Sequence, residues 1–251
     1  MLDGDGALPA GGLAVLVDSA LGNAIMTNLP SQWGLVTSHL HLELLRPVPG
    51  GAGELTCVAE QCSLDDSFGL ADGDVRLEDG TVLAKATIGS VVLDAATRSD
   101  RAPVKAPPAT SATIATPTRS HPQAHRLTAG EPVLEGLGLT VLRAGRTGVR
   151  AAIPASPRLA NSSGGLHGGF GVLMGERTLD LALRAALDRE QRMRPVELRA
   201  SFLRPIIANG SPIECHAAVL HLGRRLAAAR GEVRDHRGRP AVLVDATYLT
   251  Y

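Results

Sequence analysis

The sequence predicts an α+β protein in which one unit, a helix packed on an antiparallel sheet, is used twice. The first observation is an internal repeat: a shift of 158 residues aligns 9–93 with 167–251 without a gap, and 16 of these 85 positions are identical. The second is that each copy holds one apolar, helix-like stretch followed by four strand-like segments. We therefore expect two similar halves with a functional site between them.

Each copy begins with a mostly buried helix, expected over 13–29 in the first copy and 170–187 in the second, because Leu, Val, Met and Ala recur three or four residues apart. The first strand of copy one shows period-two alternation, with Leu at 40, 42 and 44. Three more strands complete the copy, and copy two repeats the order; the later strands of copy one are expected at 54–64, 69–77 and 82–93.

The two copies differ at their beginnings. Copy two has a predicted strand pair, 138–144 and 147–154, and then a polar loop before its helix, whereas copy one has only eight residues there. The sheet of copy one should therefore end in an unpaired edge, or the native chain begins upstream of Met1.

The domain organisation follows from the repeat. We expect a first domain over 1–93, a linker rich in Pro, Ala and Thr over 94–130, and a second domain over 131–251. At roughly 3.3 Å per extended residue the linker is long enough to let the halves pack side by side in one chain.

Composition excludes several classes of protein. No run of 18 uncharged apolar residues is present, so no membrane span is expected. The 25 basic and 25 acidic residues balance and are scattered, which argues against a nucleic-acid partner. The start of the chain lacks the pattern of a secretory signal, and three cysteines are too few for a disulfide framework, so we expect a cytoplasmic protein.

Metal and thiol chemistry are also not expected. His39 and His41 lie on one face of a strand but no third ligand is visible, so a structural role is the better interpretation. Cys57 and Cys215 recur in register on strands, which favours core packing over a nucleophile.

The densest polar signal is the segment 161–169, Asn-Ser-Ser-Gly-Gly-Leu-His-Gly-Gly, which leads into the second helix. Glycines let the backbone approach a ligand closely, and the free N–H groups at a helix start suit an oxygen that gains negative charge. Taken alone, His-Gly-Gly can also be a flexible turn followed by a polar helix start.

In context, the chain resembles the hotdog-fold acyl-CoA thioesterases of the PaaI-like type, and it does so twice, over nearly all of its length outside the linker. That family has an Asn six residues before His-Gly-Gly and an acidic residue nine after the His, which matches Asn161, His167, Gly168, Gly169 and Glu176. A strand that ends in Arg-Pro and a late Asp-Gly hairpin also resemble the family. The resemblance implies two hotdog domains that form an intramolecular pseudo-dimer.

In such pairs each active site is shared between partners, and the resemblance implies one complete site here. It would combine Asn161, His167 and the Gly168 amide from copy two with Asp18 and Thr37 from copy one. The amide would polarise the thioester carbonyl, Asp18 would act as general base or as nucleophile, Thr37 would orient the water or the carboxylate, and the Asn would hold the carbonyl or the water. Gly169 would contact the substrate.

The opposite, possible second site departs from the family pattern at almost every point. Pro9-Ala10-Gly11 replaces His-Gly-Gly, and the carboxylate and hydroxyl positions hold Glu176 and Pro195. Pro195 has no hydroxyl and Pro9 has no backbone donor. We expect this site to be inactive.

The predicted function is hydrolysis of an acyl-CoA thioester by water, without a cofactor or metal. Arg224 and Arg225 are candidates to hold the phosphates of coenzyme A, although paired arginines on a turn are commonly only solvated. The alternative function is a non-catalytic sensor that binds acyl-CoA or an acyl-carrier thioester. A hotdog dehydratase is less favoured, because no His lies five residues after Asp18. A homo-oligomer of pseudo-dimers is possible, and the sequence leaves the acyl group open.

Overall fold

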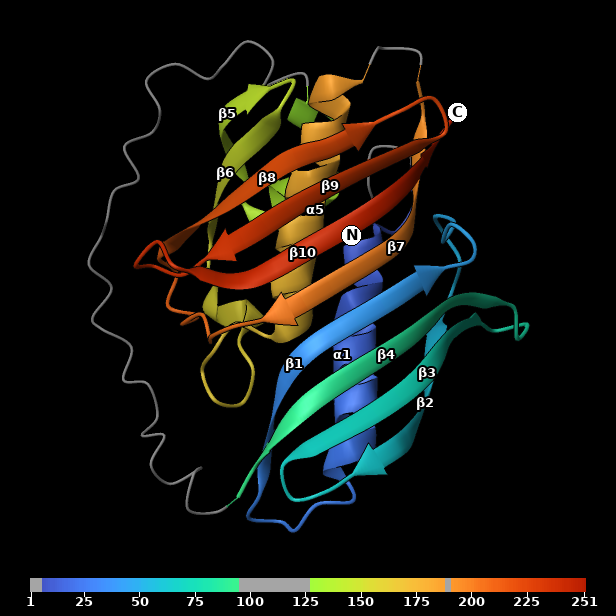
Figure 1. Cartoon of the computed structure of the whole chain (residues 1–251), viewed down its shortest axis with the longest axis vertical. Coiled ribbons are helices and arrows are strands. Elements are labelled where there is room, and N and C mark those ends of the chain that lie inside the picture. Colours follow the sequence, from blue (N-terminus) through green and yellow to red (C-terminus); the bar gives the residue numbers. More distant parts are fainter. Residues whose placement is uncertain (1–5, 95–126, 188–190) are drawn as a thin grey trace.

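The computed structural model describes residues 6–94, 127–187 and 191–251 (Figure 1). The first half holds α1 and four strands, and the second holds α4, α5 and six strands. The elements are α1 (Ala10–Met26), β1 (Gly34–Leu44), β2 (Leu55–Leu64), β3 (Phe68–Leu77), β4 (Val82–Leu93), α4 (Pro132–Leu137), β5 (Thr140–Gly145), β6 (Gly148–Pro154), a 3₁₀ turn η1 (Pro157–Leu159), α5 (Gly168–Ala186), β7 (Met193–Phe202), β8 (Pro212–Leu222), β9 (Leu226–Arg234) and β10 (Pro240–Thr250).

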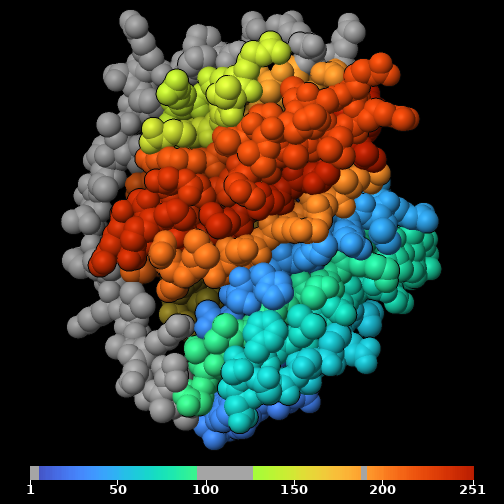
Figure 2. Space-filling view, viewed as in Figure 1, coloured from blue at the N-terminus to red at the C-terminus, as the bar shows by residue number. Residues whose placement is uncertain are grey.

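The ten strands of the described residues form one antiparallel sheet with the order β2-β3-β4-β1-β7-β10-β9-β8-β6-β5. The sequence suggested a separate sheet for each helix; instead β1 and β7 pair and make the sheet continuous. Their pairing removes two exposed strand edges from the middle of the molecule. Figure 2 shows the two halves meeting along this seam, the first in blue and green and the second in orange and red.

The seam also reveals the internal symmetry. His41 of β1 pairs with Arg199 of β7, and these two residues are equivalent positions of the repeat, 158 residues apart. On either side, His39 pairs with Ser201 and Glu43 with Glu197, so exchanging the two copies reproduces the same pairs. The halves are therefore related by a local two-fold arrangement, as the sequence predicts.

Both helices lie on one face of the sheet and contact each other (Figure 1). Their crossing is close because each contributes a glycine. A Cβ atom on Gly11 would lie 2.6 Å from Cα of Leu173, and one on Gly169 would lie 2.4 Å from Cα of Val15. These contacts are equivalent in the repeat, so the same small-residue crossing occurs twice.

The close crossing explains where the helices begin. The sequence analysis placed the helix starts at 13 and 170, after the glycines, whereas α1 begins at Ala10 and α5 at Gly168. The glycines lie inside the first turns because a side chain there would collide with the partner helix. Pro9 precedes α1 without a side-chain cap, and it suits that position because it has no N–H to satisfy.

The two ends of the sheet differ as predicted. In the second half the strand pair β5 and β6 extends the sheet beyond β8. In the first half β2, the equivalent of β8, pairs only with β3 among the described residues, and Val58 on it is 52% exposed. The expected unpaired edge is therefore present in the described part of the chain.

The segment before β5 contains a helix that the sequence analysis did not expect. In α4, Val133, Leu134 and Leu137 are buried in the core, and Gly138 ends the helix with φ of 67°. Most of the predicted linker, 95–126, lies outside the described residues; Leu127 already packs against the core. No helix among the described residues has the length and apolar character needed to cross a membrane.

Candidate active site

The carboxylate of Asp18 lies at the contact between the two halves. Its side chain is 8% exposed and projects from α1 between buried apolar neighbours. Oδ1 accepts a hydrogen bond from Thr37 Oγ1 at 2.9 Å, and Oδ2 accepts one from the backbone N–H of Gly169 at 2.9 Å. Because a buried carboxylate is costly without hydrogen-bond partners, each of its two oxygens has one here. One comes from each half, so the carboxylate is held by both.

A β-bulge brings Thr37 to this position. The register between β1 and β4 shifts between Thr37 and His39, which leaves Ser38 as the extra residue. Ser38 Oγ donates to the carbonyl of Gly89 at 2.9 Å and so fixes the bulge. Bulges re-aim a side chain at a strand position, and here the Thr37 hydroxyl is aimed at α1.

The ring of His167 adjoins the same carboxylate. Nδ1 lies 3.3 Å from Asp18 Oδ2 and accepts from the Gly169 N–H at 3.2 Å, and Nε2 lies 3.0 Å from Ser19 Oγ. Ser19 Oγ donates to the carbonyl of Val15 at 3.1 Å, so the network assigns the ring proton to Nε2. Ser19 thus orients the imidazole, a contact that the sequence analysis missed.

The start of α5 supplies a free donor. Gly168 is the first residue of the helix, and its N–H makes no hydrogen bond to any described group. A Cβ atom on Gly168 would lie 2.6 Å from Asp18 Oδ2, so only glycine fits beside the carboxylate. The N–H at the positive end of the helix dipole is suited to a partly negative oxygen.

Asn161 lies in the loop before α5 and is not joined to the Asp18 cluster. Its side chain is exposed, and its Oδ1 accepts from the backbone N–H groups of Ser163 at 3.0 Å and Gly165 at 3.1 Å. It therefore shapes its own loop. The loop is anchored by Leu166, whose N–H donates to the carbonyl of Ile206 at 2.7 Å.

The paired arginines 224 and 225 lie on the turn between β8 and β9, and both are exposed. The N–H of Thr250 donates to the carbonyl of Arg225 at 3.2 Å, which places this turn beside the end of β10. The repeat equates it with the first-half turn at 66–67, which holds Asp and Ser. The arginines thus belong to the half that carries Glu176, and they are not among the groups that contact Asp18.

The repeat-equivalent of Asp18 is Glu176, and its surroundings differ. Glu176 is fully buried and accepts two hydrogen bonds from Arg177, at 2.8 Å from Nε and 2.6 Å from Nη2. Burial alone would lower the pKa of Arg177, but the carboxylates of Glu176 and Asp180 outweigh it and raise that pKa. Arg177, the repeat-equivalent of Ser19, therefore neutralises the carboxylate of Glu176. Pro195, the repeat-equivalent of Thr37, has no hydroxyl.

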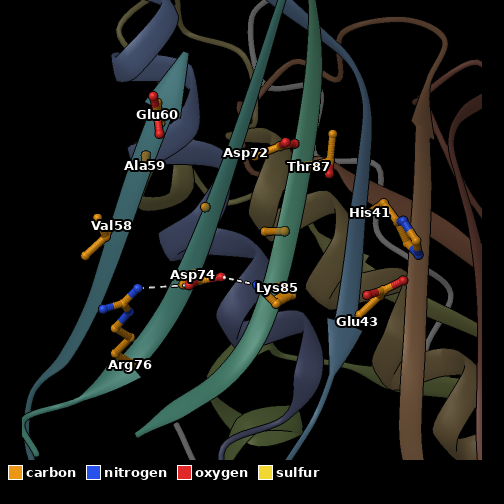
Figure 3. Close-up of a pocket in the computed structure, with 12 residues that line it drawn as sticks. His41, Glu43, Val58, Ala59, Glu60, Asp72, Asp74, Arg76, Lys85 and Thr87 are labelled. Atoms are coloured by element: carbon orange, nitrogen blue, oxygen red, sulfur yellow. Dashed lines mark hydrogen bonds and ion pairs between the residues drawn. The ribbon is translucent and has the colours of Figure 1, made fainter. Parts of the chain in front are cut away.

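A hollow of about 400 Å³ opens elsewhere, on the outer face of β1 to β4 (Figure 3). Both of its basic side chains pair with one carboxylate: Asp74 contacts Arg76 at 2.9 Å and Lys85 at 3.2 Å. These are exposed ion pairs of the kind that contribute little. The hollow does not include Asp18 or any other residue of the predicted site.

Comparisons with known proteins agree with this architecture. Residues 163–242, which contain α5, β7, β8 and β9, match the family model described as Thioesterase superfamily. The structure is similar to that of the tesB protein of Mycobacterium avium subspecies paratuberculosis, with 14% identity and a TM-score of 0.64 over 98% of this chain and 88% of that chain. It is also similar to that of the acyl-CoA thioesterase II TesB2 of Mycobacterium marinum, with 15% identity and a TM-score of 0.66 over 98% and 90%.

No match was found among curated proteins. The two structural matches extend through both halves rather than through one alone. The chain therefore has the tandem hotdog fold, and its second half carries the match to the thioesterase superfamily.

Proposed function

We propose that this protein hydrolyses acyl-CoA thioesters with water at a single composite site around Asp18. One observation carries the proposal: the Asp18 carboxylate accepts a hydrogen bond from a hydroxyl of one half and one from a helix N-terminus of the other, and no Lys or Arg of the described residues forms an ion pair with it. The equivalent carboxylate, Glu176, is paired with Arg177. This difference between Asp18 and Glu176 supports one catalytic site, at Asp18, and a purely structural role for Glu176.

The reaction needs a polarised carbonyl and an activated water. The thioester oxygen would accept from the free Gly168 N–H, which stabilises the negative charge that develops there. Asp18 would take one proton from water while the water oxygen bonds to the carbonyl carbon. The carbon–sulfur bond then breaks, and the proton passes from Asp18 to the thiolate, leaving a carboxylic acid and free coenzyme A.

Attack by Asp18 itself is the other chemical route, and it would form a mixed anhydride. We propose the general-base route, in which Thr37 and Gly169 hold the two oxygens of Asp18 in place while the carboxylate takes the proton. A single turnover in H₂¹⁸O separates the routes. The general base leaves the Asp18 side chain unlabelled, whereas hydrolysis of an anhydride by water attack at the Asp18 carbonyl introduces label into it.

The remaining residues would serve the substrate. His167, oriented by Ser19, borders the carboxylate and would contact the thioester. Gly169 supports Asp18 directly through its N–H. Asn161 would reach the carbonyl or the water with its side-chain amide, as the PaaI-like pattern implies; its Oδ1 is engaged in its own loop, which leaves the NH₂ group for this contact.

Coenzyme A as the carrier is supported by the structural similarity to a protein described as an acyl-CoA thioesterase II. The rival function is a sensor that binds an acyl-CoA or acyl-carrier thioester without cleaving it. We favour hydrolysis because a sensor has no need for a desolvated carboxylate beside a free helix N–H. We also propose that the protein acts in the cytoplasm, where acyl-CoA substrates are made, and that the pseudo-dimers can associate further.

The test is a panel of acyl-CoA substrates of different chain length and aromatic character, with detection of the free thiol. The proposal expects release of coenzyme A from at least one substrate at a rate that depends on Asp18. Thioester binding, measured by calorimetry, without thiol release from any member of the panel would support the sensor instead.

A further inference from the structure

A second hydroxyl group lies buried beside the candidate site and has no partner. Ser90 of β4 is 1% exposed, and its Oγ makes no hydrogen bond to any described residue. A buried hydroxyl without a partner destabilises the folded protein. Buried polar groups of proteins are nearly always paired, so this one requires an explanation.

The sheet register places this hydroxyl next to Thr37. Ser90 pairs directly with Thr37 on one side and with Gly69 of β3 on the other. Directly opposed side chains of antiparallel strands point to the same face, with Cβ atoms about 5 Å apart. A Cβ atom on Gly69 would meet Ile25 of α1 at 2.5 Å, so the face that these three residues share is the one that faces α1. Ser90 therefore projects toward the helix that carries Asp18.

The second half supplies a comparison within the same molecule. The repeat-equivalent of Ser90 is Tyr248, which is fully buried and pairs with Pro195 in the same register. Its hydroxyl also lacks a partner among the described residues. Burial and the carboxylates of Glu176 and Asp180 raise the pKa of this phenol.

The same strand position thus lies beside Thr37 in the first half and beside its repeat-equivalent Pro195 in the second, but it holds side chains of different volume. In the second half the side chain is a phenol ring, and in the first half it is a small hydroxymethyl group. This hydroxyl can both donate and accept hydrogen bonds, and it lies on the face of the sheet that α1 covers.

We propose that Ser90 Oγ binds the water that attacks the thioester at Asp18. This inference rests on the proposed function. Thr37 cannot donate to the water, because its hydroxyl proton is already committed to Asp18 Oδ1. With one water proton directed at Asp18 and the other at Ser90 Oγ, an oxygen lone pair remains free for the carbonyl carbon. Holding the water in this way supplies orientation, which general-base catalysis requires.

The test is the Ser90→Ala variant, with steady-state hydrolysis of the best acyl-CoA of the panel and thermal unfolding measured on the same sample. We expect kcat to fall about tenfold or more with KM changed by less than about twofold, since the water acts after the substrate is bound. We also expect an unchanged or higher melting temperature, because the substitution removes a buried, unpaired hydroxyl. If Ser90 had only a structural role, its substitution would lower both kcat and the melting temperature.

Tyr248→Phe is the matched control. It removes the equivalent unpaired hydroxyl from the second half, and kcat should remain within about twofold of the wild-type value. Unchanged kcat in Ser90→Ala, or a loss that follows a lowered melting temperature, would overturn the inference. If the wild-type protein cleaves thioesters and loses this activity in Asp18→Asn but not in Ser90→Ala, only the role of Ser90 fails. A wild-type protein that cleaves none overturns both proposals.

Discussion

The backbone N–H of Gly169 on α5 donates a hydrogen bond to Oδ2 of Asp18 on α1 over 2.9 Å. This bond joins the two copies of the repeat, so neither copy contains the site alone. Placing both copies in one chain removes the need for them to be identical. The carboxylate of Asp18 accepts hydrogen bonds from a hydroxyl and a backbone amide, whereas the carboxylate of Glu176 is buried and paired with Arg177.

Thr37→Val should lower kcat about tenfold to a hundredfold. Valine matches the shape of threonine but lacks the hydroxyl that donates to Asp18 Oδ1, so the carboxylate loses its orientation. Thr37→Ser is the control and should retain most of the activity. Steady-state kinetics of the two variants make the comparison, and equal activity of Val and Ser variants would contradict the assigned hydrogen bond.

Gly168→Ala should reduce kcat by about tenfold or more, because the added methyl group would lie 2.6 Å from Asp18 Oδ2 and displace the carboxylate. The repeat offers a natural control, since the equivalent position in the first half is already Ala10. The reverse change, Ala10→Gly, should leave turnover unaltered. A fully active Gly168→Ala enzyme would show that the carboxylate does not need this space.

Glu176→Gln should lower the free energy of unfolding by on the order of 3 kcal/mol, because it leaves the buried guanidinium of Arg177 with less than its full set of charged partners. Thermal or urea unfolding measures this change. Substituting the exposed Glu135 by Gln provides a surface control with little expected effect. Equal stability of the two variants would argue that the buried pair is not required.

The unpaired edge of the sheet should be visible in amide exchange. β2 pairs on one side only, whereas its repeat-equivalent β8 pairs with both β6 and β9. Peptides covering 55–64 should therefore exchange hydrogen for deuterium faster than those covering 213–222. Equal protection of the two segments would mean that another segment or another subunit covers β2.

Most of the architecture was accessible from the sequence because the repeat carries it. The alignment of the two copies predicted two related halves, and alternating Leu40 and Leu42 predicted the first strand, which the structure contains as β1. The continuous sheet was not predicted, because pairing of β1 with β7 depends on contacts between copies, and strand periodicity reports only which face is buried. The short α4 was missed because it lies next to the proline-rich linker.

Within the candidate site, the sequence named candidate polar residues, but it did not show how they contact one another. The spacing from Asn161 to Glu176 drew attention to the loop, yet it did not reveal that the Asn side chain holds its own loop. Ser19 and Ser90 carry no motif and were overlooked. A signal for both was present in the repeat, where Ser19 aligns with Arg177 and Ser90 with Tyr248, so that a small polar residue of one copy stands opposite a much larger residue of the other.

The most direct test of the composite site compares Asp18→Asn with Glu176→Gln in steady-state hydrolysis of one good acyl-CoA substrate, normalised to folded protein. We predict that Asp18→Asn lowers kcat by on the order of a hundredfold or more while thioester binding persists, since it removes the base and keeps the shape of the side chain. Glu176→Gln should retain near-wild-type kcat. An inactive Glu176→Gln protein together with an active Asp18→Asn protein would contradict the account.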